Sequence, residues 1–107
     1  MATTPQDWRV TALIESKRAI IALSAANDEH GDGPELTRAE ILDRYWAAAQ
    51  AANAAAGALI AGELQAGMSW PEICRALGFN DVPTTRKAVG PALAAGAERL
   101  RERLPDA

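Results

Sequence analysis

Six polar or basic side chains between residues 69 and 87 have the chemistry to bind an anionic polymer. They are Ser69, Arg75, Thr84, Thr85, Arg86 and Lys87. A guanidinium group such as that of Arg86 can donate to O6 and N7 of guanine, whereas threonine side chains contact thymine methyl groups or phosphates. Helix N-termini favour anions, so Ser69 at a helix start is expected to contact phosphate together with Arg75. These residue types predict contact with double-stranded DNA if helices place them on one surface.

The residues before Gly78 predict a short helix. Ser69 and Glu72 have the spacing of a capping box, in which the Ser69 hydroxyl accepts from the Glu72 N–H and the Glu72 carboxylate accepts from the Ser69 N–H. Pro71 falls in the first turn, where its missing N–H has no cost. An apolar stripe at helical spacing is formed by Ile73, Ala76 and Leu77. Gly78 then supplies the left-handed residue that ends the helix.

A second helix is expected to begin a few residues after Gly78. Asp81 or Val82 can cap it, and Pro83 suits a first helical position. Two short helices joined by a tight glycine turn make a helix-turn-helix, whose second helix enters the major groove with its N-terminal half. Residues 84–87 lie in that half, so the pattern predicts that they meet DNA.

Residues 69–79, with the sequence SWPEICRALGF, resemble the first half of helix-turn-helix domains in small bacterial and phage regulators. The stretch is also similar to the last domain of sigma factors, and the resemblance covers roughly residues 58–89. In that family a small residue four positions before the glycine lets the two helices touch, and here it is Cys74. The family has apolar residues about six and nine positions after the glycine, where this chain has Thr84 and Lys87. A longer turn over residues 80–83 would restore an apolar face through Ala88 and Val89. The resemblance implies a DNA-binding regulator.

Two longer helices are expected before this motif. Thr4 can cap a helix that has Pro5 at its first position and ends near Ala25 or Ala26. Thr37 and Glu40 form another capping box, and the absence of proline from residue 38 to residue 66 predicts one long helix. A bend near Gly57 is expected, so that residues 58–66 would support the helix-turn-helix. Trp70 is expected to anchor its helix on this long one.

Apolar residues recur on one side of each long helix. In the first helix they are Trp8, Val10, Leu13, Ile14, Ile20, Ile21 and Leu23. In the second they are Ile41, Leu42, Tyr45, Trp46, Ala49, Ala52, Ala56, Leu59, Ile60 and Leu64. Small side chains let helices approach closely, so the alanine-rich residues 47–58 should lie against the first helix, a second copy of the chain, or both. This predicts an N-terminal helical hairpin.

Residues after the motif predict one more helix. The Gly90-Pro91 pair is expected to interrupt the helix that begins near Asp81, and a final helix should run from Ala92 to Leu104. Its arginines, Arg99, Arg101 and Arg103, are expected to be solvated. No stretch has the alternating pattern of a strand, so the fold class is all-α. We expect a hairpin over residues 1–57, which serves dimerisation, and a helix-turn-helix domain with a C-terminal helix over residues 58–107.

The sequence lacks the patterns of known catalytic and metal sites. No nucleophile elbow, phosphate-binding glycine loop or dinucleotide fingerprint is present. The acidic loop over residues 27–34 faintly resembles a calcium loop, but the twelfth position from Asp28 is Ala39 rather than glutamate. Cys74 and His30 alone cannot form a zinc site, and we expect Cys74 to pack in the core. We therefore expect no enzyme activity, metal or cofactor.

The charge is unevenly distributed along the 107 residues. The net charge is −3, yet residues 68–107 carry six basic and five acidic side chains, whereas residues 1–67 carry five and nine. This asymmetry is in the direction expected of a C-terminal DNA-binding region. Only 5% of residues are aromatic and much of the hydrophobic content is alanine, which predicts a thin core and self-association.

These observations favour a homodimeric transcriptional regulator of bacterial or phage type that binds double-stranded DNA in the cytoplasm. Its two recognition helices would lie about 34 Å apart, which is one turn of duplex. No run of apolar residues reaches the roughly 20 needed to span a bilayer, so no membrane partner is expected. The alternative is a helical protein-interaction module, such as an antitoxin, an anti-repressor or the small subunit of a phage DNA-packaging machine.

Overall fold

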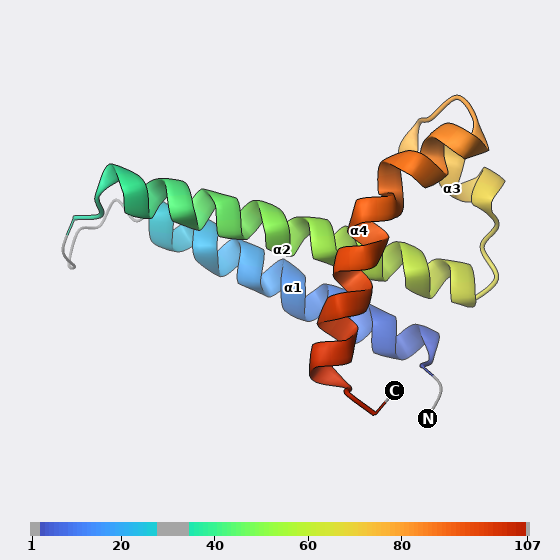
Figure 1. Cartoon of the computed structure of the whole chain (residues 1–107), viewed down its shortest axis with the longest axis horizontal. Helices are drawn as coiled ribbons and strands as arrows, with labels where there is room; N and C mark the ends of the chain where they lie inside the picture. Colours follow the sequence, from blue (N-terminus) through green and yellow to red (C-terminus); the bar gives the residue numbers. More distant parts are fainter. Residues whose placement is uncertain (1–2, 28–34, 107) are drawn as a thin grey trace.

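The computed structural model describes residues 3–27 and 35–106, and all regular structure within these ranges is α-helical. The helices are α1 (Pro5–Ala26), α2 (Arg38–Gln65), α3 (Trp70–Leu77) and α4 (Val82–Arg103). The all-α fold class is therefore confirmed. The predicted acidic loop, including Asp28 and His30, lies almost entirely outside the described residues. Figure 1 shows α1 and α2 side by side, with α3 and the start of α4 at one end of the pair.

Both long helices begin where the capping patterns predict. The Thr4 hydroxyl accepts from the Asp7 N–H at 3.2 Å, and the Asp7 carboxylate accepts from the Thr4 N–H at 2.8 Å. Thr37 and Glu40 form the same reciprocal pair. Each box satisfies N–H groups that the first turn of a helix leaves without a helical partner, which fixes the start of the element.

The buried side of the hairpin is different from the predicted apolar side. The buried residues of α1 are Thr11, Ala12, Glu15 and Ala19. Those of α2 are Ala48, Ala51, Ala54, Ala55, Gly57, Ala58 and Gly62. The predicted stripes are wrong as core faces, because Ile20, Leu42 and Trp46 are 63%, 72% and 65% exposed. The fully buried positions of the hairpin are mostly small residues. Many of its large apolar side chains are exposed, whereas others, such as Trp8, Ile14 and Ile60, are half-buried.

Glycines allow α4 to cross α2 at very short range. A Cβ atom at Gly57 would lie 1.7 Å from the backbone oxygen of Ala92, and one at Gly96 would lie 2.5 Å from the backbone nitrogen of Ala58. Gly57 was expected to bend α2, but α2 continues through it as one helix. The glycine instead provides room for a neighbouring backbone. The expected domain boundary at residue 57 thus falls inside a continuous helix, at its crossing with α4.

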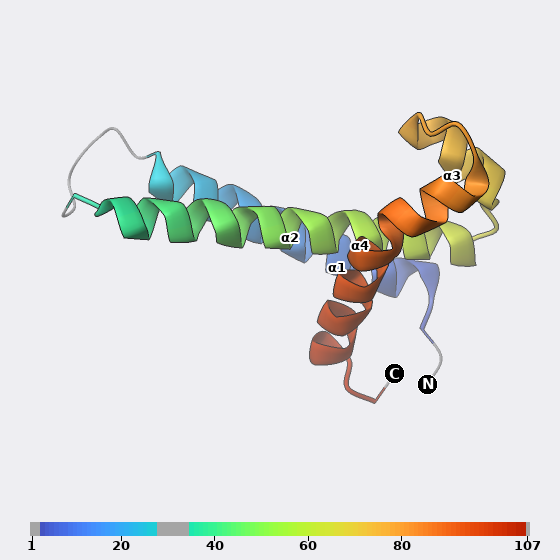
Figure 2. The same ribbon diagram turned by 45° about the horizontal axis from the view of Figure 1, so that its top comes forward.

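The chain from Val82 to Arg103 forms one helix, so the predicted interruption at Gly90-Pro91 is wrong. Pro91 lies inside α4, and Figures 1 and 2 show the helix changing direction along its length. A proline removes one helical hydrogen bond and crowds the carbonyl four residues earlier, which bends a helix that tertiary contacts hold on both sides. The first part of α4 packs against α3, and the second part packs across α2 and α1.

The C-terminal half of α4 also corrects the expectation of a fully solvated arginine face. Arg101 is exposed, but Arg99 and Arg103 reach α1. Arg103 donates from Nε to the Thr11 hydroxyl at 3.1 Å and from a terminal nitrogen to the Asp7 carbonyl at 2.7 Å. These contacts fix α4 on the hairpin and so set where α3 and the turn project.

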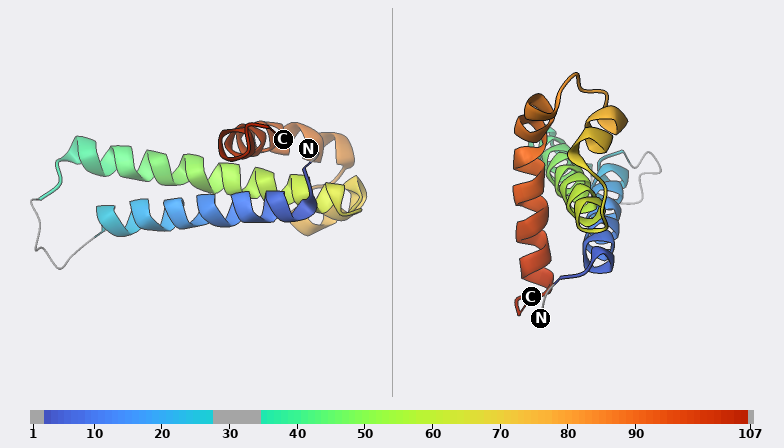
Figure 3. Two further views of the ribbon diagram at one scale, coloured as in Figure 1. Left: turned by 90° about the horizontal axis from the view of Figure 1, so that it is seen from below. Right: turned by 90° about the vertical axis from the view of Figure 1, so that its right-hand side faces the viewer.

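The molecule is elongated. Its radius of gyration is 16.1 Å, whereas a compact chain of this length would have about 13 Å. Figure 3 shows the reason: α4 crosses the hairpin near one end, and the part of the hairpin that holds the end of α1 and the start of α2 extends beyond it.

Candidate nucleic-acid interface

The start of α3 is held by Ser69. Its hydroxyl accepts from the Glu72 N–H at 3.3 Å, as predicted. The return contact is different, because the Glu72 carboxylate accepts from the Ser69 hydroxyl at 3.0 Å and not from its backbone N–H. The cap therefore has one backbone bond, and the Ser69 side chain is engaged with Glu72.

Gly78 ends α3 as expected. Its φ of 79° is in the left-handed region, and the Phe79 N–H donates to the Cys74 carbonyl at 3.1 Å. Cys74 is buried and its thiol donates to the Phe79 carbonyl at 3.2 Å, so the predicted packing role is confirmed. The predicted stripe is only partly right, because Ile73 is buried while Ala76 and Leu77 are exposed.

Asp81 caps α4, which confirms the predicted second start. Its carboxylate accepts from the Thr84 N–H at 2.8 Å. This bond, together with one from the Thr84 side chain, holds the pKa of Asp81 below its ordinary value, because both stabilise the charged form. The capping contact and the lowered pKa of Asp81 therefore have the same cause.

Thr85 is not available to DNA, so its assignment as a contact residue is wrong. The residue is 0% exposed, and its hydroxyl donates to the Asp81 carbonyl at 2.7 Å. Val89, one helical turn further on, is buried, whereas Ala88 is exposed. The inner face of α4 therefore runs through Thr85 and Val89, so the predicted apolar face is right at Val89 and wrong at Ala88.

Arg86 and Trp70 form a pair that the sequence does not indicate. The guanidinium carbon of Arg86 lies 4.9 Å from the centre of the Trp70 ring, within the range of a cation–π contact. Trp70 was expected to anchor α3 on α2, but its charged partner comes from α4. The two residues are 16 positions apart, so only the packing of α3 on α4 brings them together.

The remaining predicted residues are exposed at the same end of the molecule. Ser69 and Arg75 belong to α3 and its cap, and Thr84, Arg86 and Lys87 lie in the first two turns of α4. Between residues 69 and 89 the two acidic side chains, Glu72 and Asp81, both serve caps. The three cations of this stretch, Arg75, Arg86 and Lys87, are exposed and form no ion pair with a described residue. We call this set of five residues the α3–α4 surface.

The described residues were compared with two requirements, the ligand cluster of a metal site and the length of a membrane span. Residues 3–27 and 35–106 contain no group of three or more His, Cys, Asp or Glu side chains placed to hold a metal. None of the described helices combines the length and apolar character of a membrane span. The chain matches no family model, no curated protein and no solved structure.

Proposed function

We propose that this chain is a DNA-binding protein that acts as a homodimeric transcription regulator and reads the major groove with the first turns of α4. One observation supports this most strongly. The glycine turn and α3 hold the start of α4 so that Thr85 is buried while Thr84, Arg86 and Lys87 are exposed. A helix start with outward cations is what a recognition helix needs.

The residues of the α3–α4 surface have separate roles in this proposal. Stacking on Trp70 limits the motion of the Arg86 side chain, and a stacked guanidinium keeps its N–H edge for hydrogen bonds to a guanine. Lys87 and Arg75 neutralise phosphates. Thr84 contacts phosphate or a thymine methyl group, and the N-terminus of α3 at Ser69 faces the backbone.

The proposal of a homodimer follows from surface area. The chain exposes 7219 Å², whereas a compact monomer of 11.3 kDa exposes about 5,700 Å². The difference of about 1,500 Å² exceeds the roughly 800 Å² that each partner contributes to a standard interface. A second copy that covered the outward apolar side chains through a standard interface would remove about half of this excess.

The apolar side chains that a second copy would cover lie mainly away from α4. We define the hairpin face as Leu13, Ile20, Ile41, Leu42, Tyr45, Trp46, Ala49, Ala52, Ala56 and Leu59, all exposed. Within it, Ile20, Ala52, Ala56 and Leu59 help to line a groove of about 380 Å³ between α1 and α2. Because one face has both bulky side chains and an alanine groove, two copies can interlock about a two-fold axis.

Fluorescence anisotropy with duplex DNA at low and moderate salt tests the DNA-binding proposal. We expect binding that weakens steeply with salt, because phosphate contacts release counterions. Arg86→Ala combined with Lys87→Ala should weaken binding by about a hundredfold, as expected for one base contact and one phosphate contact.

The matched control is Arg38→Ala combined with Arg101→Ala, which removes the same charge from exposed positions away from the α3–α4 surface. This control should change the affinity far less. Equal effects of the two double variants would reject the assigned surface, and no binding at low salt would reject DNA as the partner.

The hairpin face also favours a second candidate, a helical protein-interaction module. Side chains such as Leu42 and Trp46, exposed at 72% and 65%, would serve a foreign protein as well as a second copy. A pull-down that returns a stoichiometric protein partner and no nucleic acid, together with absent DNA binding, would favour this module over the regulator.

A further inference from the structure

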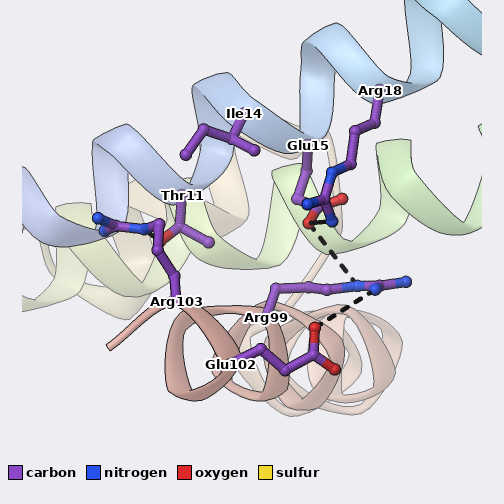
Figure 4. Close-up of a pocket in the computed structure, with 7 residues that line it drawn as sticks. All are labelled: Thr11, Ile14, Glu15, Arg18, Arg99, Glu102 and Arg103. Atoms are coloured by element: carbon purple, nitrogen blue, oxygen red, sulfur yellow. Dashed lines mark hydrogen bonds and ion pairs between the residues drawn. The ribbon is translucent and has the colours of Figure 1, made fainter. Parts of the chain in front are cut away.

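A pocket between α1 and the end of α4 lies away from the α3–α4 surface. It has a volume of about 210 Å³ and is lined by Thr11, Ile14, Glu15, Arg18, Arg99, Glu102 and Arg103. Figure 4 shows Glu15 and Arg18 from α1 close to Arg99 and Glu102 from α4, whereas the guanidinium of Arg103 turns the other way, past Thr11. A water molecule occupies about 30 Å³ of liquid, so the pocket has room for a molecule of several heavy atoms.

Positive charge exceeds negative charge in this pocket. Three guanidinium groups face two carboxylates. Arg99 contacts both Glu15, at 3.8 Å, and Glu102, at 3.6 Å. Arg103 donates to two uncharged acceptors, the Thr11 hydroxyl and the Asp7 carbonyl. These bonds fix its guanidinium at the pocket, and its positive charge favours an anion.

Glu15 indicates that the ligand must also carry a hydrogen-bond donor. The residue is 2% exposed, and its Oε1 pairs with Arg18 at 3.0 Å. Its Oε2 is buried and has no hydrogen-bond partner within the described chain. A buried oxygen of a carboxylate is stabilised by a donor, and it repels an anion that has none. The partner that satisfies both Arg103 and Glu15 is an anion that also carries an O–H or N–H group. Arg18, whose side chain is 58% exposed, can turn outward to admit it.

We propose that this pocket binds a small anion that carries its own hydrogen-bond donor, such as hydrogen phosphate, a phosphate monoester of a polyol or an α-hydroxy carboxylate. The anionic oxygens contact Arg99 and Arg103, and the donor contacts Oε2 of Glu15. This site is separate from the proposed DNA surface and does not depend on it.

Two pairs of matched anions test the proposal on the full chain by calorimetry at constant ionic strength. Near neutral pH, phosphate has an O–H group and sulfate has none, and glycolate differs from acetate by one hydroxyl. We expect phosphate to bind at least about tenfold more tightly than sulfate, or glycolate more tightly than acetate by the same factor, because one charge-assisted hydrogen bond separates them. The preferred pair tells whether the natural ligand is a phosphate or a carboxylate.

Glu15→Gln should remove the preference, because an amide can donate to either anion. The control Glu98→Gln changes an exposed carboxylate of α4 that does not line the pocket, and this variant should retain the preference. Circular dichroism shows whether each variant is folded. The affinities within each pair of anions are also measured on the unsubstituted chain, so the test remains valid if a variant does not fold. Equal affinities within both pairs, or no binding of any of the four anions, would overturn the proposal.

Discussion

Thr85 and Arg86 are adjacent in sequence but have opposite environments. Thr85 is fully buried and bonded to the Asp81 carbonyl, whereas Arg86 is exposed and lies over Trp70. Consecutive residues of a helix point about 100° apart, so a polar run of four cannot all face one partner. The proposed reading face therefore contains Thr84, Arg86 and Lys87, and Thr85 supports them from inside.

Thr85→Val tests whether Thr85 stabilises the fold or contacts DNA. The substitution retains the shape of the side chain and removes its hydroxyl, so we expect the free energy of unfolding to fall by about 1 kcal/mol. DNA affinity measured by anisotropy should stay the same, because the side chain does not reach the surface.

The matched variant is Thr84→Val, at the exposed neighbouring position. It should weaken DNA binding while changing urea stability little. The assignment of the two threonines would be reversed if Thr85→Val reduced the affinity and Thr84→Val did not.

At the scale of elements, the crossing of α4 over α2 determines where the α3–α4 surface points. The crossing depends on Gly57 and Gly96, whose missing side chains let the two backbones meet. Any side chain here would push α4 away from the hairpin and strain the contacts of Arg103 with α1.

Gly57→Ala should therefore destabilise the fold by about 3 kcal/mol or more, because its Cβ would overlap the backbone of Ala92. Gly90→Ala is the control, since no atom of another element lies within 4 Å of a Cβ placed there. In the control, helix propensity and crowding by Pro91 oppose each other, so the change should stay below about 1 kcal/mol. Urea denaturation measures both, and equal losses would contradict the close crossing.

Helix starts were well predicted from sequence because they depend on local chemistry. Thr4, Thr37, Ser69 and Asp81 all cap the helices that follow them, and Gly78 has the left-handed conformation expected of it. Each of these features needs only residues within one turn. The hydroxyl or carboxylate bonds to an N–H three positions later, whatever the rest of the chain does.

The buried faces were not predictable in the same way. Periodicity places large apolar residues inside, but α1, α2 and α4 meet through alanine and glycine, so Leu42 and Trp46 remain outside. The Arg86–Trp70 contact and the continuity of α4 through Pro91 also depend on tertiary packing. Five of the six predicted contact residues are exposed, and Thr85, which is buried, is the one that the structure contradicts.

At the scale of the whole molecule, α4 connects the two proposed interfaces. It packs on the hairpin, whose outer side is the hairpin face, and its first turns belong to the α3–α4 surface. If two copies meet through the hairpin faces, their α3–α4 surfaces are related by the same two-fold axis, as a palindromic operator requires. The thin alanine core would be supplemented by apolar area from the partner, so folding and dimerisation should be linked.

Ile20→Glu tests this arrangement by light scattering coupled to size-exclusion chromatography. Ile20 is 63% exposed, so the variant should fold, but the charge would enter the symmetric interface twice. We expect the dimer to weaken by at least about a hundredfold, because two unpaired charges would be buried. Leu77→Glu, at a residue 47% exposed on α3, should leave the dimer intact. A monomeric unchanged chain would contradict the hairpin interface.

The most direct test of the DNA-binding proposal is a nuclear magnetic resonance titration of the isotope-labelled protein with duplex DNA. We expect the amide signals of Ser69, Arg75, Thr84, Arg86 and Lys87 to shift in a salt-dependent manner, while those of the hairpin face stay in place. Shifts confined to the hairpin face, or none at low salt, would contradict the proposal.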